Sequence, residues 1–177
     1  GQRLSVEVTP HHLFLDESAA KKLGNFAKVN PPLRSKAHVA SLWRALSNGE
    51  IDVISSDHAP HLPEEKLRAY QEAPSGVPGL ETMLPLLLNA VARRRLTLPQ
   101  VALLSSTNPA RIFGLKGKGE IREGFDADLV LVDMKQPFKV RASEFYSKCK
   151  WSPFDGWKLQ GEIEKVFLRG VESFDGE

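Results

Sequence analysis

The first half of the chain combines short apolar runs with amphipathic segments, a pattern typical of strands that alternate with helices. Residues 4–8 alternate apolar and polar side chains up to Pro10, and Ile51-Asp-Val-Ile54 is a short apolar run. Both segments predict strands, because alternation fits a half-buried strand and proline ends ladder pairing. In parallel α/β proteins the polar residues directly after such strands form the active site.

Four further segments have the apolar spacing of helices. They cover residues 19–23, 35–46, 80–95 and 98–104, and the third is strongly apolar with Pro85 near its first turn, where proline is tolerated. The second segment carries one apolar stripe at helical spacing. That stripe consists of Val39, Leu42, Trp43 and Leu46.

The second half changes its period at about residue 116. Before that point, residues 107–114 begin with cap-type side chains and end in glycine, which predicts a short helix. After it, residues 119–124, 127–133 and 162–169 predict short strands of a β-rich appendage. Within the α/β part, the second predicted strand and the polar residues after it are followed by a long polar stretch, residues 62–73, which we interpret as a lid-like loop.

Composition narrows the class of protein. The 177 residues carry 24 basic and 22 acidic side chains and are 41% hydrophobic, which indicates a globular chain without the basic surface of nucleic-acid-binding proteins. The single cysteine, Cys149, excludes an internal disulfide, fits a reducing compartment and leaves histidine and carboxylate as the available metal ligands. No apolar run approaches a membrane span, and Gly1-Gln-Arg-Leu4 leads into a strand and not a signal peptide. We expect a cytoplasmic protein without membrane or nucleic-acid partners, and a chain that is part of something longer.

The stretch Ser55-Ser-Asp-His-Ala-Pro-His61 places a carboxylate and two imidazoles directly after the second predicted strand. Asp57 stands where parallel α/β enzymes carry catalytic residues. A lone aspartate at this position is also common as a turn or helix-cap residue. His58 and His61 add candidate ligands at a spacing that an ordinary loop also has. The pattern alone leaves a metal or acid–base site and a polar turn both open.

Three further polar residues are candidates. On an extended strand, His11 and His12 point to opposite faces, so they would not both bind one metal ion; one would face a site and the other the core. A structural histidine is the alternative for each of them. Asn30, between two turn-like segments, is equally explained as a turn residue.

Several motifs together resemble the C-terminal part of dihydroorotases, cyclic amidohydrolases of the amidohydrolase superfamily. Allantoinases and dihydropyrimidinases share some of them, but the Thr-Pro-His-His and His-Ala-Pro-His sequences favour dihydroorotase. In chain order the motifs are Val8-Thr-Pro-His-His-Leu13, Lys28-Val-Asn-Pro-Pro-Leu-Arg34, Ile54-Ser-Ser-Asp-His-Ala-Pro-His61, Gly76-Val-Pro-Gly-Leu-Glu-Thr82, Asn108-Pro-Ala-Arg111, Gly124-Phe-Asp-Ala-Asp-Leu-Val130 and Trp151-Ser-Pro-Phe-Asp-Gly156.

This resemblance implies an enzyme of pyrimidine biosynthesis that reversibly closes N-carbamoyl-L-aspartate to dihydroorotate. It implies two divalent metal ions, with zinc the expected metal, at the mouth of a (β/α)₈ barrel, where a bridging hydroxide attacks an amide carbonyl of the ring. Asp57 matches the aspartate that binds metal and shuttles the proton. His61 and Asn30 match the residues that hold the substrate carboxylate, and Ser75 and Gly76 match the backbone segment that touches the ring.

The family's other metal ligands have no counterpart in this chain, because their motifs would lie upstream of residue 1. The resemblance therefore assigns residues 1–115 to about the last two βα units of the barrel and residues 116–177 to the small β domain. We expect this α/β chain to be inactive alone and to need the missing N-terminal part or a second copy. Two alternatives stay open: a non-catalytic partner that scaffolds aspartate transcarbamoylase, and an allantoinase-type cyclic amidohydrolase.

Overall fold

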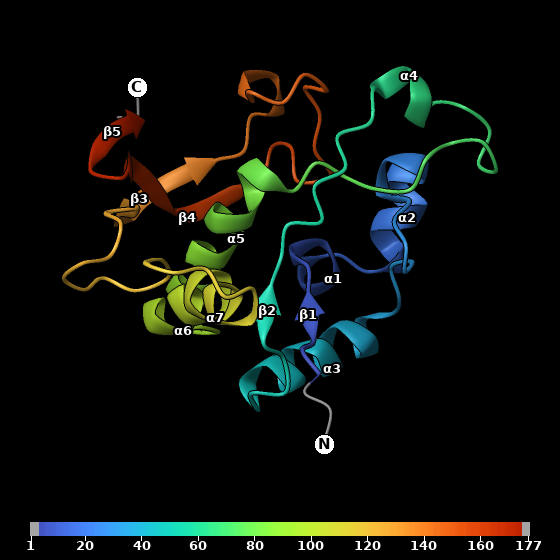
Figure 1. Ribbon diagram of the computed structural model, residues 1–177. Coiled ribbons are helices and arrows are strands. Elements are labelled where there is room, and N and C mark those ends of the chain that lie inside the picture. Colours follow the sequence, from blue (N-terminus) through green and yellow to red (C-terminus); the bar gives the residue numbers. More distant parts are fainter. Residues whose placement is uncertain (1–3, 175–177) are drawn as a thin grey trace. The chain divides into compact units, whose positions relative to one another are not determined.

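The computed structural model describes residues 4–174 and has a mixed α/β fold (Figure 1). The chain divides into two compact units, each with its own internal contacts. One unit comprises Val6–Leu84 and Lys139–Trp157, and the other contains Pro85–Phe138 and the chain from Lys158 onward. The expected division at residue 115 into a barrel segment and a small β domain concerns the family's architecture and stays a prediction.

Two short parallel strands organise the first unit. Strand β1 (Glu7–Val8) pairs with β2 (Val53–Ile54), with Glu7 opposite Val53 and Val8 opposite Ile54 (Figure 1). Both predicted strands form, although each is two residues long and shorter than its predicted segment, residues 4–8 and 51–54. Residues 1–3, at the start of the expected lead-in, lie outside the described residues. Because the strands are parallel, the residues that follow each strand emerge at the same edge.

The expectation that His11 and His12 lie on extended backbone is wrong. Helix α1 (Pro10–Phe14) begins directly after β1, with Thr9 extended at its N-cap and Pro10 in its first turn. Proline suits this position because its fixed φ is helical and its missing N–H has no intrahelical partner there. The Thr-Pro pair is therefore a helix start as well as the end of a strand.

Helix α3 anchors the core of the first unit. It spans Lys36–Ser47, close to the predicted segment, and buries Trp43 and Leu46 of the expected stripe. The indole N–H of Trp43 donates to the Leu13 carbonyl at 2.7 Å, and the ring meets Phe14 edge-on. This packing fixes α1 against α3. The unit also contains α2 (Glu17–Leu23), the 3₁₀ helices Gly24–Ala27 and Ala142–Glu144, and α4 (Pro63–Lys66).

The segment after β2 turns back on itself. Ala59 N–H donates to the Val77 carbonyl at 3.0 Å, and His58 forms a parallel bridge with Val77. Two glycines allow this close approach: a Cβ at Gly79 would lie 2.3 Å from the Ser56 carbonyl oxygen, and one at Gly76 would lie 2.4 Å from Cβ of Ala59. Residues 56–59 and 76–79 therefore form one packed layer beside the strand ends.

The second unit contains helices followed by an antiparallel hairpin. The predicted strand at residues 119–124 does not form, because that segment is a series of turns with positive φ at Gly119 and Gly124. Thr107 is not a cap: it lies inside helical backbone, and its hydroxyl donates to the Gly119 carbonyl. The elements here are α5 (Leu80–Ala92), which begins in the first unit, α6 (Leu98–Ala102), the π-helical turn Leu103–Thr107, α7 (Asn108–Ile112), and a sheet of β3 (Leu129–Lys139), β4 (Lys158–Leu168) and β5 (Val171–Phe174) in the order β3-β4-β5.

Candidate functional site

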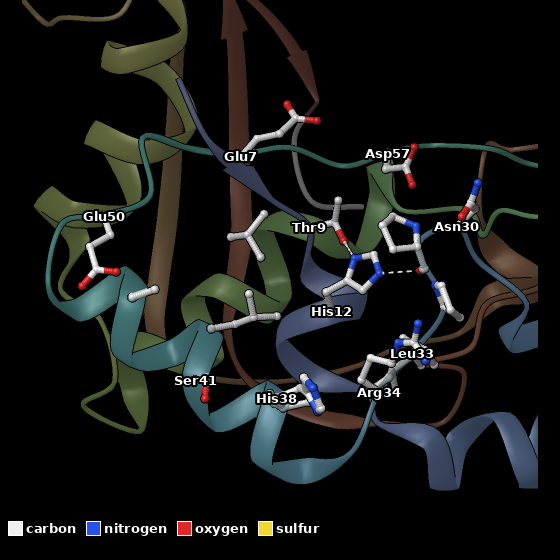
Figure 2. A pocket seen from close by; sticks show the side chains of 17 residues that line it. Glu7, Thr9, His12, Asn30, Leu33, Arg34, His38, Ser41, Glu50 and Asp57 are labelled. Atoms are coloured by element: carbon white, nitrogen blue, oxygen red, sulfur yellow. Dashed lines mark hydrogen bonds between the residues drawn. The ribbon is translucent and has the colours of Figure 1, made fainter. Parts of the chain in front are cut away.

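Asp57 lies at the carboxyl end of β2, beside a pocket of about 720 Å³ in the first unit. Its backbone has a left-handed φ of 44°, and its side chain is 50% exposed. Aspartate tolerates this conformation better than most residues. Asn30 lines the same pocket, and Figure 2 shows Asp57, Asn30 and His12 toward one end and Glu50 toward the other. The structure thus brings together two of the residues that the sequence singled out.

His12 fixes the loop that carries Asn30. Its Nε2 lies 2.8 Å from the Pro31 carbonyl, and its Nδ1 lies 2.7 Å from the Thr9 hydroxyl (Figure 2). A carbonyl only accepts hydrogen bonds, so Nε2 carries the proton and Nδ1 accepts from Thr9. The ring therefore ties the start of α1 to the Asn30–Pro31 turn.

His11 is the buried neighbour of Asp57. Only 1% of the side chain is exposed, and its Nε2 lies 3.7 Å from Oδ2 of Asp57 without a hydrogen-bond partner in the described part of the chain. Burial, followed by the adjacent His12 ring, lowers the pKa of His11 to about 3. The imidazole is therefore neutral near pH 7, and the pair is a polar contact and not a salt bridge. Of the two histidines, His11 faces the carboxylate and His12 lines the pocket.

His58, for which the sequence offered no specific role, binds a helix end. Its Nδ1 accepts from the backbone N–H groups of Gly79 and Leu80, both at 3.2 Å. Helix α5 begins at Leu80, and the first N–H groups of a helix have no intrahelical acceptor. His58 acts as a cap supplied from a distant part of the sequence, which no local motif indicates.

His61, Ser75 and Gly76 form a second cluster. The Nε2–H of His61 donates to the Ser75 carbonyl at 3.1 Å, while its Nδ1 lies 4.0 Å from the Glu65 carboxylate. Gly76 adopts a φ of 131°, in the region that favours glycine. These three residues are not among those that line the pocket of Asp57 and Asn30. A backbone hydrogen bond from Gly76 N–H to the Lys28 carbonyl, at 2.9 Å, connects the loop that contains Gly76 to the loop that contains Lys28.

The described residues do not complete a metal centre. Within residues 4–174, no three His, Cys, Asp or Glu side chains gather to hold an ion. Catalytic zinc sites use three protein ligands and a water, whereas this site offers the Asp57 carboxylate and, beside it, the unbonded Nε2 of His11. The side chains of residues 4–174 alone therefore do not fit a full metal site. No part of the described chain has a helix of the length and apolarity needed to cross a bilayer.

A parallel α/β unit with an exposed carboxylate at the carboxyl end of its strands has the layout of an α/β enzyme. The sequence identifies the family of this α/β protein. Residues 7–172 match the amidohydrolase family, and the chain belongs to that family.

Among curated relatives, the chain is similar to two archaeal dihydroorotases. It is 48% identical to that of Halobacterium salinarum over 171 residues, which cover 97% of this chain and 40% of the relative. It is 49% identical to that of Methanosarcina mazei over 152 residues, which cover 85% of this chain and 33% of the relative. The chain thus spans at most about two fifths of the length of these relatives.

The fold is similar to solved cyclic amidohydrolases. The L-hydantoinase (dihydropyrimidinase) from Arthrobacter aurescens superposes with a TM-score of 0.92 and 37% identity, covering 97% of this chain and 39% of that one. The dihydropyrimidinase from Brevibacillus agri gives a TM-score of 0.91 and 30% identity, with 97% and 39% covered. The resemblance to the amidohydrolase superfamily and to dihydroorotases, inferred from the motifs, is confirmed.

Proposed function

We propose that this chain forms part of a dihydroorotase, a metal-dependent enzyme that interconverts N-carbamoyl-L-aspartate and dihydroorotate. The observation that carries the proposal is that Asp57 and Asn30, which are 27 residues apart in the sequence, line one pocket at the strand ends. The identity of 48–49% to dihydroorotases supports this substrate over a hydantoin. In this proposal, residues 1–115 supply the last two βα units of the barrel and residues 116–177 supply strands of the small β domain.

Asp57 is the proposed proton carrier. In ring opening, water adds its oxygen to the amide carbonyl carbon, the ring C–N bond breaks, and the nitrogen gains a proton. The Asp57 carboxylate takes the proton that the water loses and passes it to that nitrogen; ring closure is the reverse. A half-exposed carboxylate at the mouth of the pocket can reach both atoms. We also propose that it provides one ligand of a divalent metal centre, with zinc the expected ion, whose other ligands come from outside this chain.

Binding of the substrate is assigned to the remaining site residues. Asn30 offers an amide donor from the pocket wall, and His61 offers a ring beside Ser75. The amide N–H of Asn30 pairs well with a substrate carboxylate, and the His61 Nε2–H, which donates to the Ser75 carbonyl here, exchanges that bond to reach it. The backbone of Ser75 and Gly76 is the proposed contact with the ring. Since a single chain supplies only these groups, we expect it to be inactive without the rest of the enzyme.

Turnover by the complete natural polypeptide tests the proposal. That polypeptide, loaded with zinc, is expected to convert dihydroorotate and to lose activity on removal of the metal by a chelator. The 177-residue chain alone is expected to show no turnover. Activity of the isolated chain, or a complete polypeptide that leaves dihydroorotate and carbamoyl-aspartate unchanged, would contradict the proposal.

A hydantoinase is the second candidate, because the L-hydantoinase of Arthrobacter aurescens shares the fold at a TM-score of 0.92. Hydantoin, dihydrouracil and allantoin should therefore be assayed beside dihydroorotate. Asn30 and His61 make the experiment specific, since a substrate without a carboxylate gains nothing from them. Replacing Asn30 by alanine should raise KM for dihydroorotate and leave hydantoin hydrolysis, if any is found, unchanged.

A further inference from the structure

Lys66 is a fully buried lysine in an otherwise charged and polar stretch. Its side chain has 0% exposure, although the segment Pro-Glu-Glu-Lys resembles a solvated surface helix. Its Nζ donates to three backbone carbonyls, those of Gly76 at 2.8 Å, Pro74 at 2.9 Å and Lys28 at 3.3 Å. An ammonium group has three N–H donors, so this set of acceptors is complete.

The charge of Lys66 is balanced by dipoles. In residues 4–174 no carboxylate lies within 4.0 Å of its Nζ, and the ring of Trp151 lies 5.6 Å away. Burial, with a further effect of the Lys28 charge, lowers the pKa of Lys66 to about 8. Burying an ammonium group is costly unless hydrogen bonds replace its water. The three carbonyls therefore determine where this side chain, and the backbone that carries them, can lie.

Lys28 repeats the arrangement from the other side. Its Nζ donates to the carbonyls of Tyr70 at 2.5 Å and Ala73 at 2.6 Å, and it lies 4.5 Å from the centre of the Tyr70 ring. The two lysines together bind four carbonyls within residues 70–76. This stretch has no helix or strand of its own, so these contacts replace secondary structure in fixing its path.

We propose that Lys66 and Lys28 are positioning residues that hold residues 70–76 so that the Ser75 and Gly76 backbone meets the substrate. Ser75 lies between two residues whose carbonyls bind Lys66, and its own carbonyl accepts from His61. Lys66, Lys28 and residues 70–76 together form a carbonyl clamp. The assignment rests on the proposed function for its substrate and on the hydrogen bonds for its geometry.

The clamp also touches the residues assigned to the substrate carboxylate. The indole N–H of Trp151, whose ring faces Lys66, donates to the His61 carbonyl at 2.8 Å. Lys28 precedes Asn30 by two residues, and its carbonyl is shared by Lys66 and Gly76 N–H. Loosening the clamp should therefore disturb substrate binding without removing a group that takes part in proton transfer.

The test compares Lys66→Met and Lys28→Met with a matched control in the complete natural polypeptide. Methionine keeps much of the lysine's length and removes its donors. Lys21→Met makes the same change at an exposed position of α2. Amide hydrogen exchange in residues 70–76 reports the geometry, and KM and kcat for dihydroorotate report the consequence.

Both clamp variants are expected to speed exchange in residues 70–76 about tenfold or more and to raise KM about tenfold, with kcat within about twofold of wild type. Lys21→Met should match wild type in every readout. If Lys66→Met does not fold, Lys28→Met, which leaves the buried ammonium in place, decides. Unchanged exchange in a folded Lys28→Met variant overturns the clamp.

The two proposals fail in different ways. Faster exchange with unchanged KM refutes the positioning role. Wild-type protein that does not turn over dihydroorotate refutes the proposed function, and exchange alone then decides whether the clamp exists. A fall in kcat with unchanged KM would place the lysines in the chemical step and would also overturn the inference.

Discussion

The two clusters of candidate site residues differ in how completely their polar groups are bonded. Around Asp57, the His11 Nε2 and the Ser55 hydroxyl are buried without partners among the described residues, and the carboxylate is half exposed. Around Gly76, the Lys66 ammonium, the His61 ring and the backbone carbonyls bond to one another. Buried polar groups in native proteins are normally bonded. The first cluster therefore has the features of a site that other groups complete, and the second those of a site built by this chain.

The largest expected effect comes from neutralising the carboxylate of Asp57 in the first cluster. Asp57→Asn keeps the shape of the side chain and abolishes its charge, so activity of the complete polypeptide should fall at least about 1000-fold, as expected for loss of an acid–base group. The matched control is Glu50→Gln, which neutralises a carboxylate at the opposite end of the same pocket. Steady-state rates on dihydroorotate measure both. Retention of a tenth of the activity would remove Asp57 from its assigned role.

Adding a methyl group at Gly76 tests how tightly the second cluster is packed. Gly76→Ala places a methyl group 2.4 Å from Cβ of Ala59 in a backbone conformation that alanine avoids, and should lower the free energy of unfolding by about 3 kcal/mol. Gly114→Ala is the control, because that glycine has a positive φ with open space around it. It should cost about 1 kcal/mol. Urea unfolding measures the difference, and equal losses would show that the contact with Ala59 is unimportant.

The buried ammonium predicts a pH dependence of stability. The pKa of Lys66 is about 8 in the folded chain, against an ordinary 10.5. Between these values the unfolded chain binds more protons, so the free energy of unfolding contributed by Lys66 rises with pH. Wild type should gain about 2 kcal/mol relative to Lys66→Met between pH 8 and pH 10.5. Lys28, the neighbouring cation, is present in both proteins. A fall in the stability of wild type relative to Lys66→Met with rising pH would contradict the assignment.

The smallest expected effect concerns the helix cap. His58→Ala removes the acceptor of two N–H groups at the start of α5 and should lower the free energy of unfolding by about 1 kcal/mol. His58→Asn keeps a polar acceptor and should recover part of this loss. Thermal or urea unfolding of the three proteins is sufficient. No loss in the alanine variant would show that water replaces the ring.

Sequence patterns predicted the elements whose causes are local. The strand at residues 51–54 and helix α3 follow from apolar spacing, and their positions are confirmed. Helix α1 was mistaken for extended backbone because Pro10 was considered only as the end of a strand. The strand expected at residues 119–124 failed because its glycines adopt positive φ, which turns favour and strands do not.

The residues of the candidate site likewise differ in whether a local sequence pattern identifies them. Asp57 and Asn30 were recognised from motifs and lie at one pocket, while their roles stay predictions. Lys66 was not recognised, because a lysine after two glutamates resembles an exposed residue in any local window. Its significance depends on carbonyls that lie at positions 28, 74 and 76. The capping role of His58 was missed for the same reason, since its partners lie 21 and 22 residues away.

The burial of Lys66 also gives this segment a distinctive chemical reactivity. Reagents that acylate amines need an accessible Nζ, and trypsin needs a lysine side chain that can enter its specificity pocket. The fully buried Lys66 meets neither demand, whereas Lys21, exposed on α2, meets both. Acetylation of Lys66, or cleavage after it, would require residues 70–76 to leave their place first. A peptide modified at that lysine would thus mark the molecules in which residues 70–76 have left the carbonyl clamp.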